Sequence, residues 1–272
     1  MRKFLGMIQK VASKSRALSL FALKVRNQCN AIIANYIGKA HEGAESGEHW
    51  FLENYVGSEP ATLFDVGANR GDWTKAALKL SGETTVYSYE PDPRAVSQYR
   101  DSMHNNENVF FHDVAIGSEV GEMKLFLAKH STEHSTAAPV ANKDYTSSTV
   151  QVSTVDAQVK QHRIDYIDLL KIDVEGYESM VLKGASETLR KEKIGCIQFE
   201  YGENWKNAGA TLTHVCSFLE SHDFRTFLLR PKTLKVIDID VLGEYFSYSN
   251  YIAVHKRNVE NIVSLISKSK IL

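Results

Sequence analysis

The chain has 272 residues, 43% hydrophobic and 24% charged, with a net charge of −1 and ordinary numbers of glycine and proline. This composition excludes a disordered or collagen-like chain and suffices for one large hydrophobic core or two smaller ones. The three cysteines lie far apart, which excludes an encoded disulfide framework or cysteine zinc site, and no apolar run reaches the roughly 18 residues of a membrane span, so we expect a soluble, cytoplasmic protein.

The first 41 residues are strongly basic. They carry eight Lys or Arg and no acidic residue, whereas the rest of the chain has 24 basic and 33 acidic residues. On a helical projection, apolar residues between Phe4 and Val25 share one side, and Arg16 and Arg26 interrupt it. We expect a basic helical extension over residues 1–50, compatible with peripheral contact to an anionic membrane, with an organellar transit peptide or with packing on the main domain.

From residue 61 onward, short β-rich runs alternate with helical patterns. Because parallel neighbouring strands need crossover connections of this length, the alternation predicts an α/β fold with a doubly wound, mostly parallel sheet. The predicted strands are Ala61–Val66, Thr84–Tyr89, Val109–Val114, Asp168–Ile172 and Ile194–Phe199, and the predicted helices lie near residues 73–80, 94–104, 177–188 and 212–221.

The last part of the chain has a different pattern. Two β-rich runs, Phe224–Leu229 and Leu234–Ile239, flank an Arg-Pro-Lys-Thr turn, which predicts a C-terminal antiparallel hairpin, and Tyr248–Val254 is a further strand. Between Leu127 and Val150 lies a Ser/Thr-rich stretch with little periodicity, typical of a functional or disordered loop. The sequence thus predicts one α/β domain over residues 51–258 and a helical tail over residues 259–272.

The strand-to-helix turn after the first predicted strand is the strongest local signal. Asp65 ends the strand, and Gly67 and Gly71 follow it, where a ligand needs close approach to the backbone. The third glycine of a dinucleotide fingerprint is absent, and Asp65 puts a negative charge where a phosphate would lie. Glu90 ends the second strand, 25 residues after Asp65, where a carboxylate accepts hydrogen bonds from ribose hydroxyls.

A ligand with a ribose, no pyrophosphate and a cationic amino-acid portion is S-adenosylmethionine. At this point the sequence resembles the FkbM-type S-adenosylmethionine-dependent methyltransferases. The resemblance covers roughly residues 61–202 and rests on the segments FDVGANRGDWT, YEPDP, VAIGSEVGE, IDLLKIDVEGYESMVLKGA and IQFEYG. Val155-Asp156-Ala157 departs from the family's usual Leu-Asp pair, and the first 41 residues lie outside the match.

The resemblance implies a class I methyltransferase (Rossmann-like) fold and methyl transfer to a hydroxyl of a small-molecule, sugar or lipid-linked acceptor. Carried over by position, it implies that residues at the ends of the first four strands hold the cofactor. These are Asp65, Gly67, Asn69 and Gly71 at the methionine end, Glu90 at the ribose, Asp113 and Val114 at the adenine, and Asp173 between cofactor and acceptor.

A protonated alcohol is a poor nucleophile, so the reaction needs a general base or a metal that lowers the alcohol's pKa. The candidate catalytic carboxylates are Asp173, Glu175 and Glu200, of which Glu200 is the preferred base. If all three converge, they offer oxygen ligands for a divalent cation. Glu175 is also compatible with an acid at a helix N-terminus, and Glu200 with a solvated strand end.

Two other functions compete with this interpretation. One is a non-catalytic Rossmann-like binding module, placed on membranes by the basic helix. The other is a nucleic-acid methyltransferase, which is disfavoured by the acidic balance after residue 41 and by the absence of an Asn-Pro-Pro-Tyr-type loop. We therefore expect no nucleic-acid partner. The identity of the acceptor is expected to depend on residues 128–150 and on the N-terminal helices, and the sequence does not define an oligomeric state.

Overall fold

The computed structural model describes residues 6, 9, 10, 12–37, 46–104, 106–128, 134–135 and 145–267. The chain divides into two compact units, residues 1–40 and residues 41–272. Predictions for residues 1–5, 7, 8 and 11 and for most of the Ser/Thr-rich stretch, residues 129–133 and 136–144, lie outside the described residues.

The first unit contains α2 (Arg16–Ile37), a 22-residue helix with no acidic side chain in its sequence. Leu18, Phe21, Val25, Ile32 and Tyr36 recur at helical spacing, and each is at least 40% exposed. In the part of the chain that the structure describes, no helix combines the length and apolarity needed to cross a membrane.

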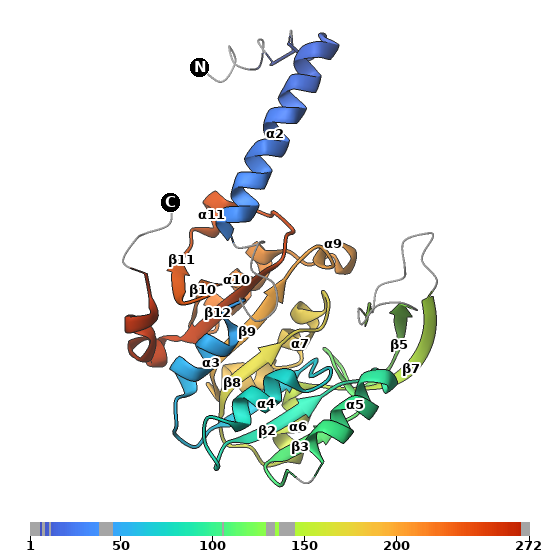
Figure 1. The fold of residues 1–272 in the computed structure, drawn as a ribbon, viewed down its shortest axis with the longest axis vertical. Coiled ribbons are helices and arrows are strands. Elements are labelled where there is room, and N and C mark those ends of the chain that lie inside the picture. Colours follow the sequence, from blue (N-terminus) through green and yellow to red (C-terminus); the bar gives the residue numbers. More distant parts are fainter. Residues whose placement is uncertain are drawn as a thin grey trace. The chain divides into compact units, whose positions relative to one another are not determined.

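The second unit is built on an eight-stranded sheet with strand order β11-β10-β12-β9-β8-β1-β2-β3 (Figure 1). The five strands from β3 to β9 in this order pair in parallel, while β12 is antiparallel to both β9 and β10. The strands are β1 (Thr62–Val66), β2 (Thr85–Tyr89), β3 (Val109–His112), β8 (Ile167–Ile172), β9 (Ile194–Tyr201), β10 (Phe224–Arg230), β11 (Thr233–Val236) and β12 (Ser249–His255).

This topology confirms the predicted fold class, a class I methyltransferase-like doubly wound sheet with a C-terminal antiparallel hairpin. The hairpin β10–β11 forms the edge of the sheet. The last strand, β12, inserts between β9 and β10, and all seven of its residues are buried. Because β12 lies between β9 and β10, both strands form backbone hydrogen bonds with it.

Helices cover both faces of this sheet because the strand order runs outward in two directions from β1 and β8. Right-handed crossovers place the helices of the two halves on opposite faces. One face carries α3 (Glu48–Val56), α4 (Asp72–Leu78) and α5 (Pro93–Met103), and the opposite face carries α6 (Val155–Gln161), α7 (Glu178–Lys183), α8 (Ser186–Arg190) and α10 (Leu212–Glu220) (Figure 1). The remaining helices are α9 (Trp205–Ala208), α11 (Ile239–Leu242) and the 3₁₀ helix η2 (Lys256–Leu265).

A second sheet stands beside the main one, with strand order β4-β7-β5-β6. Its main part is the antiparallel pair of β5 (Gly121–Ala128) and β7 (Tyr145–Ser153), flanked by β4 (Ala115–Ile116) and β6 (His134–Ser135). Both ends of the stretch predicted as an aperiodic loop are therefore strands. Alternate residues of the two strands, Leu125, Leu127 and Val150, bury one face of this pair.

Three predicted boundaries differ from the structure. The boundary at residue 50 falls inside α3, which belongs to the second unit. The helix predicted over residues 177–188 is two helices, α7 and α8, because Asp156 donates its backbone N–H to the Gly184 carbonyl and accepts hydrogen bonds from the Glu187 and Thr188 N–H groups with its carboxylate. The predicted C-terminal tail corresponds to η2, which begins at Lys256, and residues 268–272 lie outside the described residues.

Helix α3 is fixed to the sheet by its apolar face. Phe51 and Leu52 are fully buried in a cluster with Leu63 of β1 and Trp73 of α4. We expect Phe51→Ala to lower the free energy of unfolding by about 3–5 kcal/mol, because it removes a large side chain from a packed core. Urea denaturation measures this value. Val120→Ala, at a position 71% exposed, is the matched control and is expected to change stability by less than about 0.5 kcal/mol.

Candidate active site

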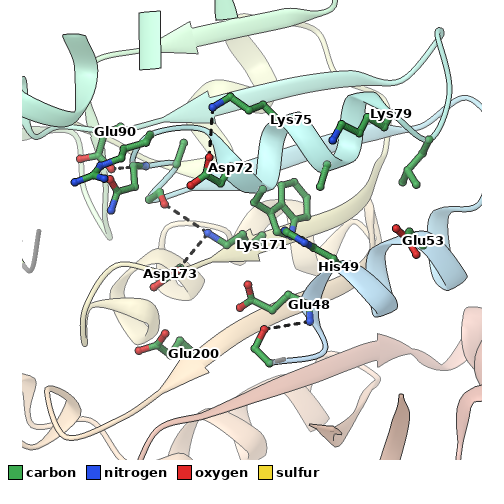
Figure 2. A pocket seen from close by; sticks show the side chains of 18 of the residues that line it. Glu48, His49, Glu53, Asp72, Lys75, Lys79, Glu90, Lys171, Asp173 and Glu200 are labelled. Carbon is green, nitrogen blue, oxygen red and sulfur yellow. Dashed lines mark hydrogen bonds and ion pairs between the residues drawn. The ribbon is translucent and has the colours of Figure 1, made fainter. Parts of the chain in front are cut away.

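A cleft of about 1130 Å³ opens at the carboxyl ends of the central strands, between the sheet and helices α3 and α4 (Figure 2). Ligands of open parallel sheets bind at this edge, beside the point where the strand order reverses. The cleft wall is rich in charged side chains from five parts of the chain, which are α3, α4 and the ends of β2, β8 and β9. They include Glu48, Asp72, Glu90, Lys171, Asp173, Glu175 and Glu200.

Strand alternation explains why these groups meet. Along β1 and β8, Leu63 and Leu169 point into the apolar core beneath α3 and α4. Two residues further along, Asp65 and Lys171 point to the same side and are direct neighbours in the parallel register. On the side of the sheet that faces α3 and α4, the side chains therefore change from apolar to charged over two residues of each strand.

Lys171 is the central charge of the cleft. Its side chain is only 6% exposed, and its Nζ lies 3.3 Å from Asp65 Oδ1 and 3.3 Å from Asp173 Oδ2. Burial lowers the pKa of this ammonium, but the carboxylates of Asp65, Asp173 and Glu48 outweigh it and raise the pKa above its ordinary value. Lys171 is charged at all physiological pH values. Sequence reasoning missed its role, although a lysine inside a buried apolar strand requires a carboxylate partner.

Asp65 does not reach the cleft wall, contrary to the expectation that it lines the methionine end. Its side chain is fully buried, and its Oδ2 accepts a hydrogen bond from Thr74 Oγ1 at 2.7 Å. Its Oδ1 faces Lys171. The physical reason is the pairing with Lys171 across the strands, which directs the carboxylate into the protein. Asp65 therefore influences the cleft indirectly, because it holds the Lys171 ammonium in place and stabilises its charge.

Glu48 is a cleft residue that sequence reasoning missed. It begins α3, and the Asn250 side chain of β12 acts on its carboxyl so as to lower the pKa. Burial raises the pKa of Glu48 to about 7, with Lys171 acting to lower it and Asp173 to raise it. An acid at the start of a helix is common in any sequence, so only the docking of α3 on the sheet reveals this position.

Glu200 lines the cleft from the end of β9, as predicted. Burial, followed by the negative charges of Asp173 and Glu175, raises its pKa well above the ordinary value for a carboxyl. A solvated strand end is therefore the wrong interpretation for this residue. Figure 2 shows Glu200, Asp173, Glu48 and Lys171 grouped around one part of the cleft.

Glu90 is 2% exposed and organises the turn after β1. Its Oε2 accepts a hydrogen bond from the Asn69 backbone N–H at 2.9 Å, and its Oε1 accepts one from the Asp92 N–H at 2.8 Å. Burial raises its pKa to about 7. Glu90 also lines the cleft.

The two glycines of the turn are required by protein packing. At Gly67, with φ +81°, a Cβ would lie 1.8 Å from the Asp173 carbonyl oxygen. At Gly71, with φ +84°, it would meet Met103 and the Tyr99 ring within 3.0 Å. Gly67 and Asn69 line the cleft, whereas Gly71 does not and serves the packing of α4 on α5.

A small apolar hollow of about 50 Å³ adjoins the cleft beyond Glu90. Val114, Ile116, Met123 and Leu125 line it together with Pro91. Of the two residues predicted to contact adenine, Val114 lines this hollow, whereas Asp113 lies outside it. The Asp113 carboxylate is 60% exposed and pairs with Arg100 at 3.0 Å.

The predicted cation-binding carboxylates do not converge. Glu175 has a φ of +55°, and its Oε2 accepts a hydrogen bond from Asn204 Nδ2 at 2.8 Å. It also precedes the helix, which begins at Glu178, so it is not an acid of the first helical turn. Within the described ranges, the metal-compatible group of side chains is Glu192, Asp223 and His255, away from the cleft. The Asp173, Glu175 and Glu200 set does not reach this spacing.

The strand order and the cleft at its switch point define an α/β protein of the class I methyltransferase type. The chain belongs to the FkbM methyltransferase family: a family model described as the methyltransferase FkbM domain matches residues 65–226, more than half of the chain. The family predicted from the sequence motifs is thereby confirmed. Glu48 and the rest of α3 lie outside the matched residues.

The individual proteins that resemble this chain share little of its sequence, with identities of 11–26%. The 2-O-methyltransferase NoeI of Sinorhizobium fredii is 26% identical over 155 residues, which cover 52% of this chain and 63% of NoeI. A crystal structure of methyltransferase FkbM from Methylobacillus flagellatus is 15% identical, with a TM-score of 0.47 over 72% of this chain and 44% of that one. A precorrin-6y C5,15-methyltransferase from Geobacter metallireducens is 11% identical, with a TM-score of 0.45 over 77% and 87%.

The buried ion pairs of Lys171 predict a large effect of its removal. Lys171→Met leaves Asp65 buried without its counter-charge, so we expect the free energy of unfolding at pH 7.5 to fall by about 3–5 kcal/mol. Guanidinium denaturation measures the change. Lys75→Met is the control, because Lys75 pairs with Asp72 at 3.3 Å in an exposed position and such pairs contribute about 1 kcal/mol or less. Equal effects of the two substitutions would contradict the central role of Lys171.

Proposed function

We propose that the protein is an S-adenosylmethionine-dependent O-methyltransferase that acts on a hydroxyl of a small-molecule, sugar or lipid-linked acceptor. The observation that carries this proposal is the arrangement of Glu90, Asp173 and Glu200 around one cleft at the carboxyl edge of the sheet. Membership of a methyltransferase family supports the reaction class. The relative NoeI, described as a 2-O-methyltransferase, supports oxygen as the methylated atom.

The residues present fit the proposed cofactor. Glu90 offers buried carboxylate oxygens for ribose hydroxyls, and the neighbouring hollow offers apolar side chains to a flat base. The buried Tyr89 hydroxyl, in a residue that lines the hollow, has no hydrogen-bond partner among the described residues and is a candidate for a polar contact to the base. Gly67, Asn69 and Asp173 line the adjoining cleft where the amino-acid end would lie.

Bound S-adenosylmethionine would supply an electrophilic methyl group that needs no further activation by the protein. The chain must therefore align the acceptor oxygen and take up its proton. Carboxyl groups near the cleft are suited to this task, because burial raises the pKa of Glu48 to about 7 and that of Glu200 well above its ordinary value. A carboxylate of raised pKa is a stronger base than a solvated one.

Calorimetric titration tests the proposed cofactor site. We expect S-adenosylmethionine and its demethylated product to bind the wild-type chain, and Glu90→Gln to weaken binding by about 10- to 100-fold, because hydrogen bonds to a charged group contribute about 1.5–3 kcal/mol. Glu203→Gln, which changes an 82% exposed carboxylate, is expected to leave the affinity unchanged. Absence of binding heat and of a thermal shift with both compounds would overturn the proposed function.

Transfer itself is tested with methyl-labelled cofactor. Incubation with pooled polar metabolites, glycans and lipids is expected to label one acceptor class with an alkali-stable methyl ether. Cofactor binding without labelling of any pool would favour the alternative of a non-catalytic binding module. Labelling of added RNA or DNA would contradict the expectation that no nucleic acid takes part.

We also propose that α2 holds the protein against an anionic membrane surface. The support is its exposed apolar face, which includes Phe21 at 66% and Ile32 at 68% exposure, together with the absence of acidic residues from the first 41 positions. Apolar side chains would enter the headgroup boundary while Lys24 and Arg26 attract anionic lipids.

Vesicle flotation tests the role of α2. The full chain is expected to float with phosphatidylserine-containing vesicles at low salt and less so at high salt, because screening weakens the attraction to lipid charge. The double variant Phe21→Ser with Ile32→Ser is expected to remain in the bottom fraction. The matched control is Val120→Ser with Val263→Ser, which changes two exposed valines of the second unit. Flotation unaffected by the α2 substitutions would contradict the proposal.

A further inference from the structure

Helix α3 is held rigidly over the cleft even though it lies outside the residues of the family match. Gly47, at its N-terminus, has a φ of +92°, and a Cβ there would lie 2.5 Å from the Arg230 carbonyl oxygen. Phe51 and Leu52 bury the inner face of the helix in the core of the sheet. The position of Glu48 in the cleft is therefore defined by the fold on both sides of this residue.

The surroundings of Glu48 contain more negative than positive charge. Lys171 supplies one ammonium, which already has ion pairs with Asp65 and Asp173. Glu200 adds a further carboxyl near the same space. The charged and titratable groups that act on Glu48 come from β1, β8 and its end, β9 and the segment before β12: Asp65, Lys171, Asp173, Glu200 and Tyr248.

One ammonium cannot balance four ionised carboxylates in a partly desolvated cleft. Burial and the surrounding carboxylates therefore raise the pKa values of Glu48 and Glu200. A ligand that brings a positive charge into the cleft would favour ionisation of the protonated acid that ionises at the lowest cost. A sulfonium group carries such a charge, whereas the thioether of the demethylated product does not.

We propose that Glu48 is the proton-accepting carboxyl of the cleft and that the positive charge of the bound cofactor converts it to its ionised form. This inference rests on the proposed function. When the cofactor binds, the Glu48 carboxyl gives its proton to the solvent buffer. When the acceptor oxygen forms its bond to the methyl carbon, the carbon–sulfur electron pair stays on sulfur, and the hydroxyl proton passes to the Glu48 carboxylate.

The charges that act on the two carboxyls distinguish Glu48 from Glu200. After burial, Lys171 is the strongest influence on Glu48, and it favours the ionised form. The strongest influences on Glu200, after burial, are the carboxylates of Asp173, Glu175, Glu178 and Glu48, which disfavour ionisation. Glu48 is therefore the acid that ionises at lower cost, and a protonated Glu200 can donate a hydrogen bond to the acceptor.

The Asn250 side chain supports this assignment. It acts on Glu48 so as to lower the pKa of that carboxyl, and its Nδ2 donates a hydrogen bond to the Tyr248 hydroxyl at 3.1 Å. Asn250 is directly opposite Glu200 in the β9–β12 register and is 3% exposed. An uncharged amide next to Glu200 in the sheet thus favours the ionised form of Glu48 without adding another negative charge.

Proton release on cofactor binding tests the proposal without a known acceptor. Calorimetric titrations at pH 7 in phosphate and in Tris, whose ionisation enthalpies differ, give the number of protons released per bound ligand. S-Adenosylmethionine and its demethylated product share the nucleoside and amino-acid parts, so their difference isolates the effect of the sulfonium charge. We expect wild type to release about half a proton more with the sulfonium compound, because a group with a pKa of about 7 is half protonated at this pH.

The variants decide which residue releases the proton. Glu48→Gln is expected to lose this difference, whereas Glu53→Gln, which changes an exposed acid of the same helix and cleft, is expected to retain it. Retention of the difference in Glu48→Gln, or its loss only in Glu200→Gln, would overturn the proposal. So would equal proton release with both ligands in wild type. Failure of both ligands to bind wild type would instead overturn the proposed function.

Thermal unfolding gives a second measurement that needs no ligand. The pKa of Glu48 is about 7 in the folded chain and has a reference value of 4.5, so the folded state binds the proton more tightly. Stability from this carboxyl is complete below pH 4.5 and is lost as the pH rises to about 7. Relative to wild type, Glu48→Gln should therefore gain Tm between pH 5 and pH 8, and Glu53→Gln should not.

A constant Tm difference for Glu48→Gln across this range would contradict the raised pKa and overturn the proposal. If Glu48→Gln does not fold, Glu48→Ala is measured in the same way, since it removes the carboxyl without adding a polar group. Unfolding of both variants would also overturn the proposal, because it would assign Glu48 to the fold.

Discussion

The cleft depends on the buried ammonium of Lys171. It lies 3.3 Å from Asp65 on the neighbouring strand and 3.3 Å from Asp173 at the end of its own strand. A buried charge is tolerated only with partners, so Lys171 and the fully buried Asp65 require each other, and Asp173, 33% exposed, adds a second counter-charge. The same contact joins β1 to β8 at the point where the strand order reverses. The interaction that stabilises the switch point therefore also sets the charge of the space in which a ligand would bind.

Much of the fold is predictable from local sequence. Val66, Tyr89 and Ile172 end apolar runs of strand length, and Gly67 follows the first with a backbone conformation that few other residues adopt. Such signals are contained in a few neighbouring residues. The small sheet was missed because the Ser/Thr-rich composition around β7 masks the alternation of Leu125 and Leu127 with Val150 across the pair. Cross-strand pairing is a non-local property, which composition does not report.

The candidate site divides in the same way. Glu90, Asp173 and Glu200 were predicted because each ends a strand, and parallel strands bring their carboxyl ends to one edge. Asp65 was assigned to the cleft, but the neighbour that withdraws it is 106 residues away in the sequence. Glu48 escaped prediction because its place depends on the packing of Phe51 and Leu52 beneath a sheet assembled from later parts of the chain. The spacing of residues in the sequence locates the ends of strands, but it does not show which helices and strands contact one another.

The distribution of acids around the cleft suggests why α3 takes part in the site. The matched domain supplies Asp65, Asp173, Glu175 and Glu200, and Lys171 is already engaged by two of them. A base needs a pKa near the working pH, which requires both burial and some stabilisation of its anion. Glu200 has burial without a nearby cation among its strongest influences, whereas Glu48 has burial together with Lys171 and the Asn250 amide. Helix α3, which precedes the matched domain, therefore supplies a carboxyl of intermediate character. Its anion is stabilised less than those of Asp65 and Asp173, which pair with Lys171, and more than that of Glu200.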